Sequence, residues 1–293
     1  MPVWEDIASA ISEAIDAPFV IEARTAVGGG CINESHSIRG NGLSYFVKLN
    51  APGRLPMFEA EAAGLAEIAR SNTVRVPQPV CHGAGDEGSW LVLEYIEFRP
   101  ASNKGMRELG RDLARMHRAT AERFGWRRDN TIGATSQVNT PDADWVAFWR
   151  ERRLGYQLRL AAAGGHRGRL IESGERLLEK LPAFFASYAP RPSLLHGDLW
   201  SGNVGFIADG TPVIFDPAVY YGDREADLAM TELFGGFAPD FYAVYREAFP
   251  LDPGYAQRKH LYNLYHVLNH LNLFGGGYGA RAERMIGELL SQV

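Results

Sequence analysis

The sequence predicts an α+β protein of two lobes, a small lobe at residues 1–97 and a larger, mainly helical lobe at residues 98–293. Strand-like segments separated by tight turns dominate the first 95 residues, whereas apolar residues at helical spacing dominate the rest. The length of 293 residues lies near the size, roughly 250–300 residues, at which a single hydrophobic core gives way to two. A sheet-rich lobe joined to a helical lobe leaves a cleft between them, and such clefts are favoured ligand sites.

The small lobe is expected to begin with an amphipathic helix and to continue as an antiparallel sheet with one inserted helix. Apolar residues from Trp4 to Ile15 recur at helical spacing and predict a helix at residues 3–16. Pro18 ends that helix because proline cannot continue the hydrogen-bond ladder. Gly40-Asn41-Gly42 predicts a hairpin turn, since Asn and Gly tolerate a positive φ. Strands are expected at residues 19–26, 35–39, 44–49, 80–83 and 90–95, and the inserted helix at residues 56–70.

The large lobe is predicted to be helical, with the boundary between the lobes near Glu97–Arg99. Two short strands are expected at residues 203–207 and 212–215. Helices are expected at residues 102–120, 142–162, 169–188, 224–233, 239–248, 255–273 and 280–292.

Composition and charge exclude several classes of protein. Thirty Lys and Arg against 35 Asp and Glu leave a net charge of −5, the wrong sign for a protein that binds nucleic acid or an anionic membrane surface. No apolar run approaches the roughly 20 residues of a membrane-spanning helix, and the acidic N-terminus does not resemble a signal peptide. Cys31 and Cys81 are too few for a disulfide framework or a four-thiolate zinc site. A cytoplasmic protein is therefore expected, and the choice between a monomer and a homodimer stays open.

The strongest chemical signal is an acidic motif in the large lobe. Asp198 follows His196-Gly197, Asn203 comes five residues after Asp198, and Asp216 follows a short apolar strand. This constellation matches phosphotransfer sites of the kinase fold, where the first Asp orients and deprotonates the attacking hydroxyl and the Asn and second Asp hold Mg²⁺. Turn residues without a function are the alternative, since Gly, Asn and Asp are common in turns. The partners upstream favour the functional interpretation.

Those partners lie in the small lobe in the order that phosphate binding requires. Gly28, Gly29 and Gly30 follow the first strand, and glycines there let backbone amides approach phosphate oxygens, although a flexible hairpin loop would explain them equally well. Lys48 lies on the same face of its strand as Phe46. A single lysine in a strand is usually just solvated, but the position of Lys48 one hairpin after the Gly loop suits a reach to the α- and β-phosphates.

A lysine that reaches phosphates needs a carboxylate to hold it, and the helix at residues 56–70 offers Glu59, Glu61 and Glu67. At about 100° per residue, Glu61 lies roughly 70° from the centre of the apolar face and Glu59 roughly 90°. The angle favours Glu61, while the alternative is that these are surface charges.

The motifs resemble those of the fructosamine kinase (ketosamine 3-kinase) family, which belongs with aminoglycoside and choline phosphotransferases in the protein-kinase-like fold. The resemblance covers nearly the whole chain, and Leu199-Trp200 together with Asp216-Pro217-Ala218 distinguishes this family from the wider group. It implies ATP-dependent phosphorylation of the 3-hydroxyl of ketosamines, the adducts that sugars form with amines, including protein lysines. The matching segments are Gly28–Asn33, Phe46–Lys48, Met57–Glu61, Asn72–Pro77, His196–Asn203, Phe215–Ala218, Tyr221–Asp223, Phe234–Phe237, Tyr265–His266 and Phe274–Gly275.

The resemblance also implies a role for each matching residue. Asp198 would be the catalytic base, with Lys48 on the phosphates and Glu61 as the ion-pair partner of Lys48. The histidine His196 would brace the catalytic loop. Asn203 and Asp216 would be the Mg²⁺ ligands, Gly28, Gly29, Gly30 and Cys31 would lie against ATP, and the backbone of Glu94, Tyr95 and Ile96 would bind adenine.

Four departures separate the chain from conventional protein kinases. Gly197 replaces the usual arginine, Pro217 follows the metal-binding Asp, and the Gly loop lacks the full G-x-G-x-x-G form. The stretch from Asp216 to the helix that begins near Glu225 is too short for an activation loop that docks a peptide. These departures favour a small acceptor in a permanently open site.

Other residues are weaker candidates for contact with the acceptor. Trp200 is placed either to stack on a sugar or to pack within the large lobe. Asp223, with Glu225 and Asp227, would attract a cationic amine or answer a helix dipole. His266 and His270 are four residues apart and suit an acceptor pocket better than zinc, since no third ligand is in view. Tyr220 and Tyr221 are expected in the same pocket and His117 in a structural role. Cys31 is either a redox switch or a small residue that merely fits the Gly loop.

Two rival functions remain open. One is a kinase of the same fold acting on choline, an aminoglycoside or a sugar. The other is a nucleotide-binding pseudokinase, which the presence of Lys48, Asp198, Asn203 and Asp216 argues against.

Overall fold

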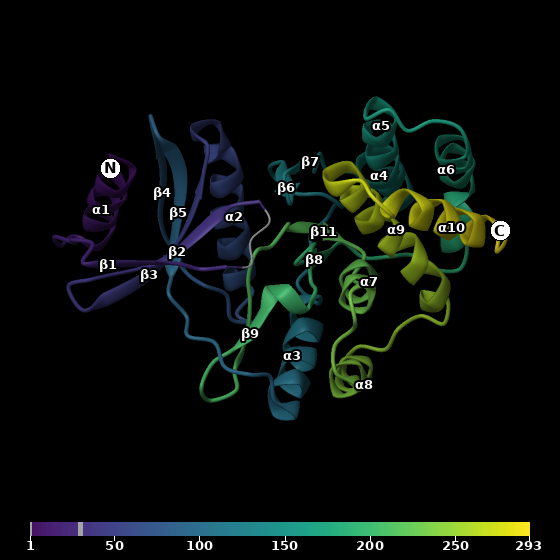
Figure 1. The fold of residues 1–293 in the computed structure, drawn as a ribbon. Helices are drawn as coiled ribbons and strands as arrows, with labels where there is room; N and C mark the ends of the chain where they lie inside the picture. The colour runs from purple at the N-terminus through teal and green to yellow at the C-terminus, as the bar shows by residue number, and fades with distance from the viewer. Residues whose placement is uncertain (1, 29–31) are drawn as a thin grey trace.

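The computed structural model describes residues 2–28 and 32–293, and it has a sheet-rich part and a helical part (Figure 1). The sheet contains five antiparallel strands in the order β1-β2-β3-β5-β4. Their bounds are β1 Ala23–Ala26, β2 Glu34–Gly40, β3 Leu43–Asn50, β4 Pro79–Gly85 and β5 Gly88–Glu94. The predicted strand at residues 19–26 therefore begins later, because Phe19 packs into the core while its N–H bonds the hydroxyl of Ser12. Asn41 and Gly42 both have positive φ, which confirms the predicted hairpin turn.

Two helices cover opposite faces of this sheet (Figure 1). Helix α1, Pro2–Ile15, packs Ile7 and Ile11 against Val47 and Val92. Helix α2, Leu55–Arg70, belongs to the other core, which also takes Leu91 from β5. The period-two alternation of strand side chains therefore places Val47 toward α1 and Lys48 toward α2.

A short connection, residues 95–102, joins this part to the helical part, and the Arg99 N–H donates to the Phe206 carbonyl at 2.7 Å. Helix α3, Asn103–Met116, lies against α8, and α9 is surrounded by α5, α7 and α10. Within the described ranges, no helix is long and apolar enough to span a membrane. The further helices are α4 Trp145–Phe148, α5 Gly155–Ala163, α6 Arg169–Lys180, α7 Glu225–Leu233, α8 Pro239–Ala248, α9 Tyr255–Phe274 and α10 Tyr278–Leu290.

Several expected helices are shorter or broken. The helix predicted at 142–162 divides into α4, a π-helical turn at Trp149–Leu154, and α5. The helix predicted at 169–188 ends at Lys180, because Pro182 has no N–H to donate and a 3₁₀ turn follows. The helix predicted at 102–120 ends at Met116.

Short strands complete the helical part. The predicted pair is present as β9, Val204–Phe206, and β10, Pro212–Ile214. Four strands of three residues were not predicted: β6 Asn130–Ile132, β7 Thr135–Gln137, β8 Ser193–Leu195 and β11 Tyr220–Gly222. Strand β8 pairs with β11, and this pairing brings the end of β8 next to the segment after Asp216.

Candidate active site

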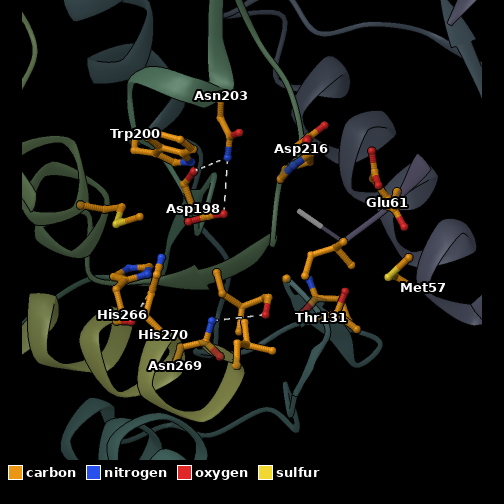
Figure 2. A pocket seen from close by; sticks show the side chains of 18 of the residues that line it. Met57, Glu61, Thr131, Asp198, Trp200, Asn203, Asp216, His266, Asn269 and His270 are labelled. Carbon is orange, nitrogen blue, oxygen red and sulfur yellow. Dashed lines mark hydrogen bonds between the residues drawn. The ribbon is translucent and has the colours of Figure 1, made fainter. Parts of the chain in front are cut away.

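A cavity of about 440 Å³ lies between α2 and β3 on one side and α7, α9 and α10 on the other. Figure 2 shows Asp198 and Asn203 on one wall, with Glu61 and Met57 of α2 facing them across the pocket. His266 and His270 of α9 lie on the wall beyond Asp198. The pocket thus gathers the charged residues that the sequence singled out for phosphoryl transfer.

Lys48 joins the two parts of the molecule through a pair of carboxylates. Its ammonium lies 2.5 Å from Glu61 Oε1 and 2.5 Å from Asp216 Oδ1, and the residue is only 4% exposed. Burial alone would lower the pKa of Lys48, but the charges of Asp216 and Glu61 outweigh it and raise that pKa. Burial raises the pKa of Glu61 against the opposing charge of Lys48. Lys48 therefore stays protonated and places a positive charge at the pocket wall.

The structure distinguishes the three glutamates of α2. Glu61 meets Lys48, as the helical angle predicts. Glu59 Oε2 instead accepts a hydrogen bond from Arg128 at 3.3 Å, and Glu67 accepts one from Tyr221 at 2.9 Å.

The loop that carries Asp198 is held from beneath by Asp227 of α7. Asp227 Oδ2 accepts from the His196 N–H at 2.7 Å, and Oδ1 accepts from the Gly197 N–H at 2.8 Å. Gly197 has φ +82°, and a Cβ there would lie 2.1 Å from the Ala218 carbonyl oxygen, so only glycine fits. The replacement of the arginine usual in protein kinases is therefore accompanied by a turn that excludes any side chain.

The side chain of His196 braces the loop from within. Its Nε2–H donates to the Phe215 carbonyl at 2.9 Å, and its Nδ1 accepts from the Asp198 N–H at 3.2 Å. Burial lowers the pKa of His196 against the charge of Asp227, so the ring is neutral and can accept at Nδ1.

Asp198 has the environment of a general base. Asn203 Nδ2 donates to the Asp198 carbonyl at 2.8 Å and lies 3.4 Å from Asp198 Oδ2 (Figure 2). Burial, with a further contribution from the charge of Asp216, raises the pKa of Asp198 to about 7, although the Asn203 hydrogen bond opposes the shift. A base with a pKa near neutrality combines a useful ionised fraction with enough basicity to take a proton.

Asp216 and Asn203 offer oxygen atoms suited to Mg²⁺. Asp216 has φ +57°, a left-handed conformation that costs a non-glycine residue about 1–3 kcal/mol and that persists mainly at functional sites. Its Oδ1 meets Lys48, and across residues 2–28 and 32–293 neither its Oδ2 nor the Asn203 amide oxygen has a hydrogen-bond partner. Among the described residues no cluster of three His, Cys, Asp or Glu could hold a metal alone. Mg²⁺ usually takes one or two protein oxygens together with phosphates and water, so this donor set fits it.

The remaining wall is aromatic and uncharged. Trp200 is 36% exposed, and its ring meets that of Phe234 edge-on at 6.0 Å. The His270 Nδ1–H donates to the His266 carbonyl at 2.8 Å, and burial lowers the pKa of His270. Burial, helped by His270, lowers the pKa of His266 to about 3. Both rings are therefore neutral and face the pocket (Figure 2).

Two predicted acceptor residues lie elsewhere. Asp223 is 1% exposed and accepts hydrogen bonds from Tyr188 at 2.9 Å and Tyr262 at 2.5 Å, so it cannot attract an amine into the pocket. Tyr221 does not line the pocket but donates to Glu67. The structure therefore places neither residue in the pocket where the acceptor was expected, because neighbouring side chains take up both polar groups.

The segments expected to bind adenine and phosphate do not line the cavity or lie partly outside the described residues. Glu94, Tyr95 and Ile96 end β5 and begin the connection between the two parts, and they do not line the cavity. Gly28 is described and has open space where a Cβ would project, whereas Gly29, Gly30 and Cys31 lie outside the described residues.

The profile of the family described as fructosamine kinase matches residues 3–292. The chain belongs to this family. As a fructosamine kinase family member, it is a phosphotransferase with a hydroxyl acceptor. It is 48% identical to a probable ketoamine kinase of Synechocystis over 98% of this chain and 97% of the relative. It is 44% identical to a chloroplastic protein-ribulosamine 3-kinase of Arabidopsis thaliana over 90% of this chain and 82% of that protein.

Solved structures agree on the fold. A putative fructosamine-3-kinase of Haemophilus somnus superposes with a TM-score of 0.90 at 29% identity, covering 98% of this chain and 97% of the other. An aminoglycoside phosphotransferase, APH(4)-Ia, superposes with a TM-score of 0.63 at 14% identity, covering 98% of each chain, and this likeness concerns the fold alone. The protein-kinase-like fold predicted from the motifs is confirmed.

Sequence reasoning missed part of this kinase site. The sequence offers Asp227 only as an attractant of amines or as a complement to a helix dipole, yet its carboxylate accepts hydrogen bonds from the backbone of the loop that carries Asp198. Asn130 and Thr131 line the pocket from β6, a strand too short to show any periodicity. The nearest signal for Asp227 is an acidic residue in the first turn of a predicted helix, which Glu225 shares, so the sequence does not distinguish the two.

Proposed function

We propose that this protein is an ATP-dependent ketosamine 3-kinase that phosphorylates sugar adducts of amines, including those on protein lysines, and so contributes to deglycation. The observation that carries the proposal is one cavity in which Asp198 lies between the Lys48–Asp216 pair and a neutral aromatic wall. Phosphates and acceptor hydroxyl would thereby meet at a buried carboxylate, as phosphoryl transfer requires.

The residues would divide the chemistry among themselves. Lys48 would bind the ATP phosphates, and Glu61 would hold Lys48 toward them. Asn203 and Asp216 would hold Mg²⁺, which neutralises charge on the transferring phosphoryl group. Asp198 would accept the proton of the 3-hydroxyl through a carboxylate oxygen while orienting that hydroxyl for attack.

We assign the adenine site to the backbone of Glu94, Tyr95 and Ile96. The Glu94 N–H already donates to the Gln78 carbonyl at 2.8 Å, and its side chain pairs with Arg75. In the part of the chain that the structure describes, Tyr95 and Ile96 have no hydrogen-bond partner for their backbone groups, which leaves these groups free for adenine. The phosphates are assigned to Gly28, Gly29, Gly30 and Cys31.

The acceptor is assigned to the wall of Trp200, His266 and His270. Aminoglycosides are polycations that need several carboxylates, and among the described residues the pocket side chains from α7, α9 and α10 include no acid. A ketosamine has a single ammonium, which aromatic faces can hold, and several hydroxyls for the imidazole nitrogens. The wall therefore supports the ketosamine assignment over the polycation alternative. Because the reaction consumes ATP, we also propose a cytoplasmic location.

The deciding experiment measures ADP release with Mg-ATP and fructoselysine, ribuloselysine, choline or an aminoglycoside, for the wild-type enzyme and Asp198→Asn. We expect turnover of a ketosamine that falls at least a thousandfold in the variant, which has lost the proton acceptor but keeps the shape. Turnover of choline or an aminoglycoside alone would contradict the substrate assignment. ATP binding without turnover of any acceptor would indicate a binding protein.

A further inference from the structure

Helix α2 contacts the helical part through a hydrogen bond that phosphoryl transfer does not itself require. Tyr221 donates from its hydroxyl to Glu67 Oε1 at 2.9 Å, and the Glu67 side chain is only 15% exposed. The other carboxylate oxygen of Glu67 faces the exposed guanidinium groups of Arg70 and Arg127. Of the three partners of Glu67, Arg70 and Arg127 are exposed charges, and Tyr221 is the partner that lies in a paired strand.

Tyr221 is held firmly by its own backbone. It lies in β11, which pairs with β8 at Leu194. On the other edge, the Tyr221 N–H donates to the Gly125 carbonyl at 2.8 Å and the Gly125 N–H donates back at 2.8 Å. A strand paired on both sides cannot follow a movement of α2, so the hydroxyl is a fixed point.

The same helix and the same segment also carry the catalytic ion pairs. Glu61 of α2 and Asp216 share Lys48, while Glu67 of α2 meets Tyr221, five residues after Asp216. Glu61 and Glu67 are six residues apart, which is about 9 Å along the helix axis. Two contacts so separated determine both the position and the tilt of α2 relative to residues 216–221.

Close packing between the two contacts leaves α2 little freedom. A Cβ at Gly64 would lie 3.2 Å from Val219 Cγ2 and 3.6 Å from Pro217 Cγ. The helix thus approaches the segment at a glycine that lies between Glu61 and Glu67, and no long loop separates Asp216 from Tyr221.

We propose that Tyr221 is a positioning residue, whose bond to Glu67 keeps α2 where Glu61 holds Lys48 toward the phosphates without any activating ligand or modification. The inference depends on the proposed function only for its kinetic readout. Residues 216–221, the short segment after Asp216, would then set the position of α2.

The test compares Tyr221→Phe with Tyr255→Phe. Tyr255 donates to Glu232 at 2.6 Å, a Tyr–Glu hydrogen bond of the same kind within the helical part and away from α2. We expect Tyr221→Phe to lower kcat/KM for ATP about tenfold, to leave KM for the ketosamine unchanged, and to speed amide hydrogen exchange in residues 58–68. Tyr255→Phe is expected to leave all three unchanged.

A second pair of variants separates the hydrogen bond from general packing. Glu67→Gln keeps an oxygen that can accept from Tyr221 and should retain most of the activity, whereas Glu67→Ala should match Tyr221→Phe. The double variant Tyr221→Phe with Glu67→Ala should lose no more than either single change. Wild-type exchange and kinetics in Tyr221→Phe, or losses that simply add, would overturn the inference. If the wild type turns over no ketosamine, the proposed function falls, and the exchange rates of α2 alone decide on Tyr221.

Discussion

Asp227→Asn is the substitution that most directly links stability to the catalytic loop. Asp227 is 1% exposed and accepts from His196 N–H at 2.7 Å, Gly197 N–H at 2.8 Å and His117 Nε2 at 3.2 Å. The hydrogen bonds from these donors hold its pKa below the usual range despite burial, so the group is a carboxylate. Asparagine has the same shape but only one acceptor oxygen, and its NH₂ group would face one of the donors.

The expected loss of stability in Asp227→Asn follows from this mismatch between one acceptor oxygen and several donors. Loss of one hydrogen bond to a charged acceptor removes about 1.5–3 kcal/mol, and the backbone N–H left unpaired costs about 1–3 kcal/mol more. We expect the free energy of unfolding to fall by about 3–5 kcal/mol, a large part of the roughly 5–15 kcal/mol typical of a folded protein. Because Asp198 directly follows Gly197, kcat should fall at least tenfold in molecules that remain folded.

Urea unfolding and ADP release at low temperature measure the two effects. Asp112→Asn is the matched control, since Asp112 is a buried carboxylate whose partner Arg115 is exposed and whose pKa is raised by burial. We expect this control to change stability by less than about 1 kcal/mol, because the raised pKa of Asp112 shows that its exposed partner Arg115 does little to stabilise the ionised carboxylate. If Asp227→Asn is as stable as the control, or if it keeps full kcat, the role given to Asp227 is wrong.

Two further substitutions, Gly110→Ala and His266→Asn, test the close approach of α3 to α8 and the lowered pKa of His266. Gly110→Ala should destabilise the protein by about 1–3 kcal/mol, because its Cβ would lie 2.6 Å from the Phe241 carbonyl oxygen of α8. Gly287→Ala is the control in the same denaturation assay. It has no atom within 4 Å of its Cβ and should stabilise the protein by about 0.5–1 kcal/mol. Stabilisation by both would contradict the close approach of α3 and α8. His266→Asn should reduce the loss of stability between pH 6 and pH 4 by up to about 1.4 kcal/mol per pH unit. The folded pKa of His266, about 3, lies below the unfolded value of 6.5, so wild-type stability declines as pH falls through that interval. Parallel pH profiles of wild type and variant would show that His266 titrates normally.

The sequence was most informative where local geometry alone determines the contact. Lys48 and Glu61 could be paired from the strand alternation and the helical angle, and the structure places their charged atoms 2.5 Å apart. The spacing of Asp198 and Asn203 within one loop likewise predicted their proximity, since five residues of a tight turn cannot separate far.

The sequence was least informative for polar residues whose hydrogen-bond partners come from distant parts of the chain. Asp223 and Asp227 are alike in sequence, four residues apart and acidic. Yet Asp223 binds the hydroxyls of Tyr188 and Tyr262, while Asp227 binds the backbone of the catalytic loop. These partners are 30 or more residues distant along the chain, so no local pattern distinguishes the two roles.

The sequence by itself predicted the order of the longer elements, the pairing of Lys48 with Glu61 and the residues to which we assign the phosphotransfer chemistry, because hydrophobic periodicity and motif spacing act over a few residues. Only the tertiary structure decided that Glu67 accepts a hydrogen bond from Tyr221, and that Tyr221 faces α2 and does not line the pocket. It also decided the neutral wall of the pocket, since burial makes His266 and His270 neutral. Burial and pairing are properties of the packed chain, and they arise only when distant segments exclude water together.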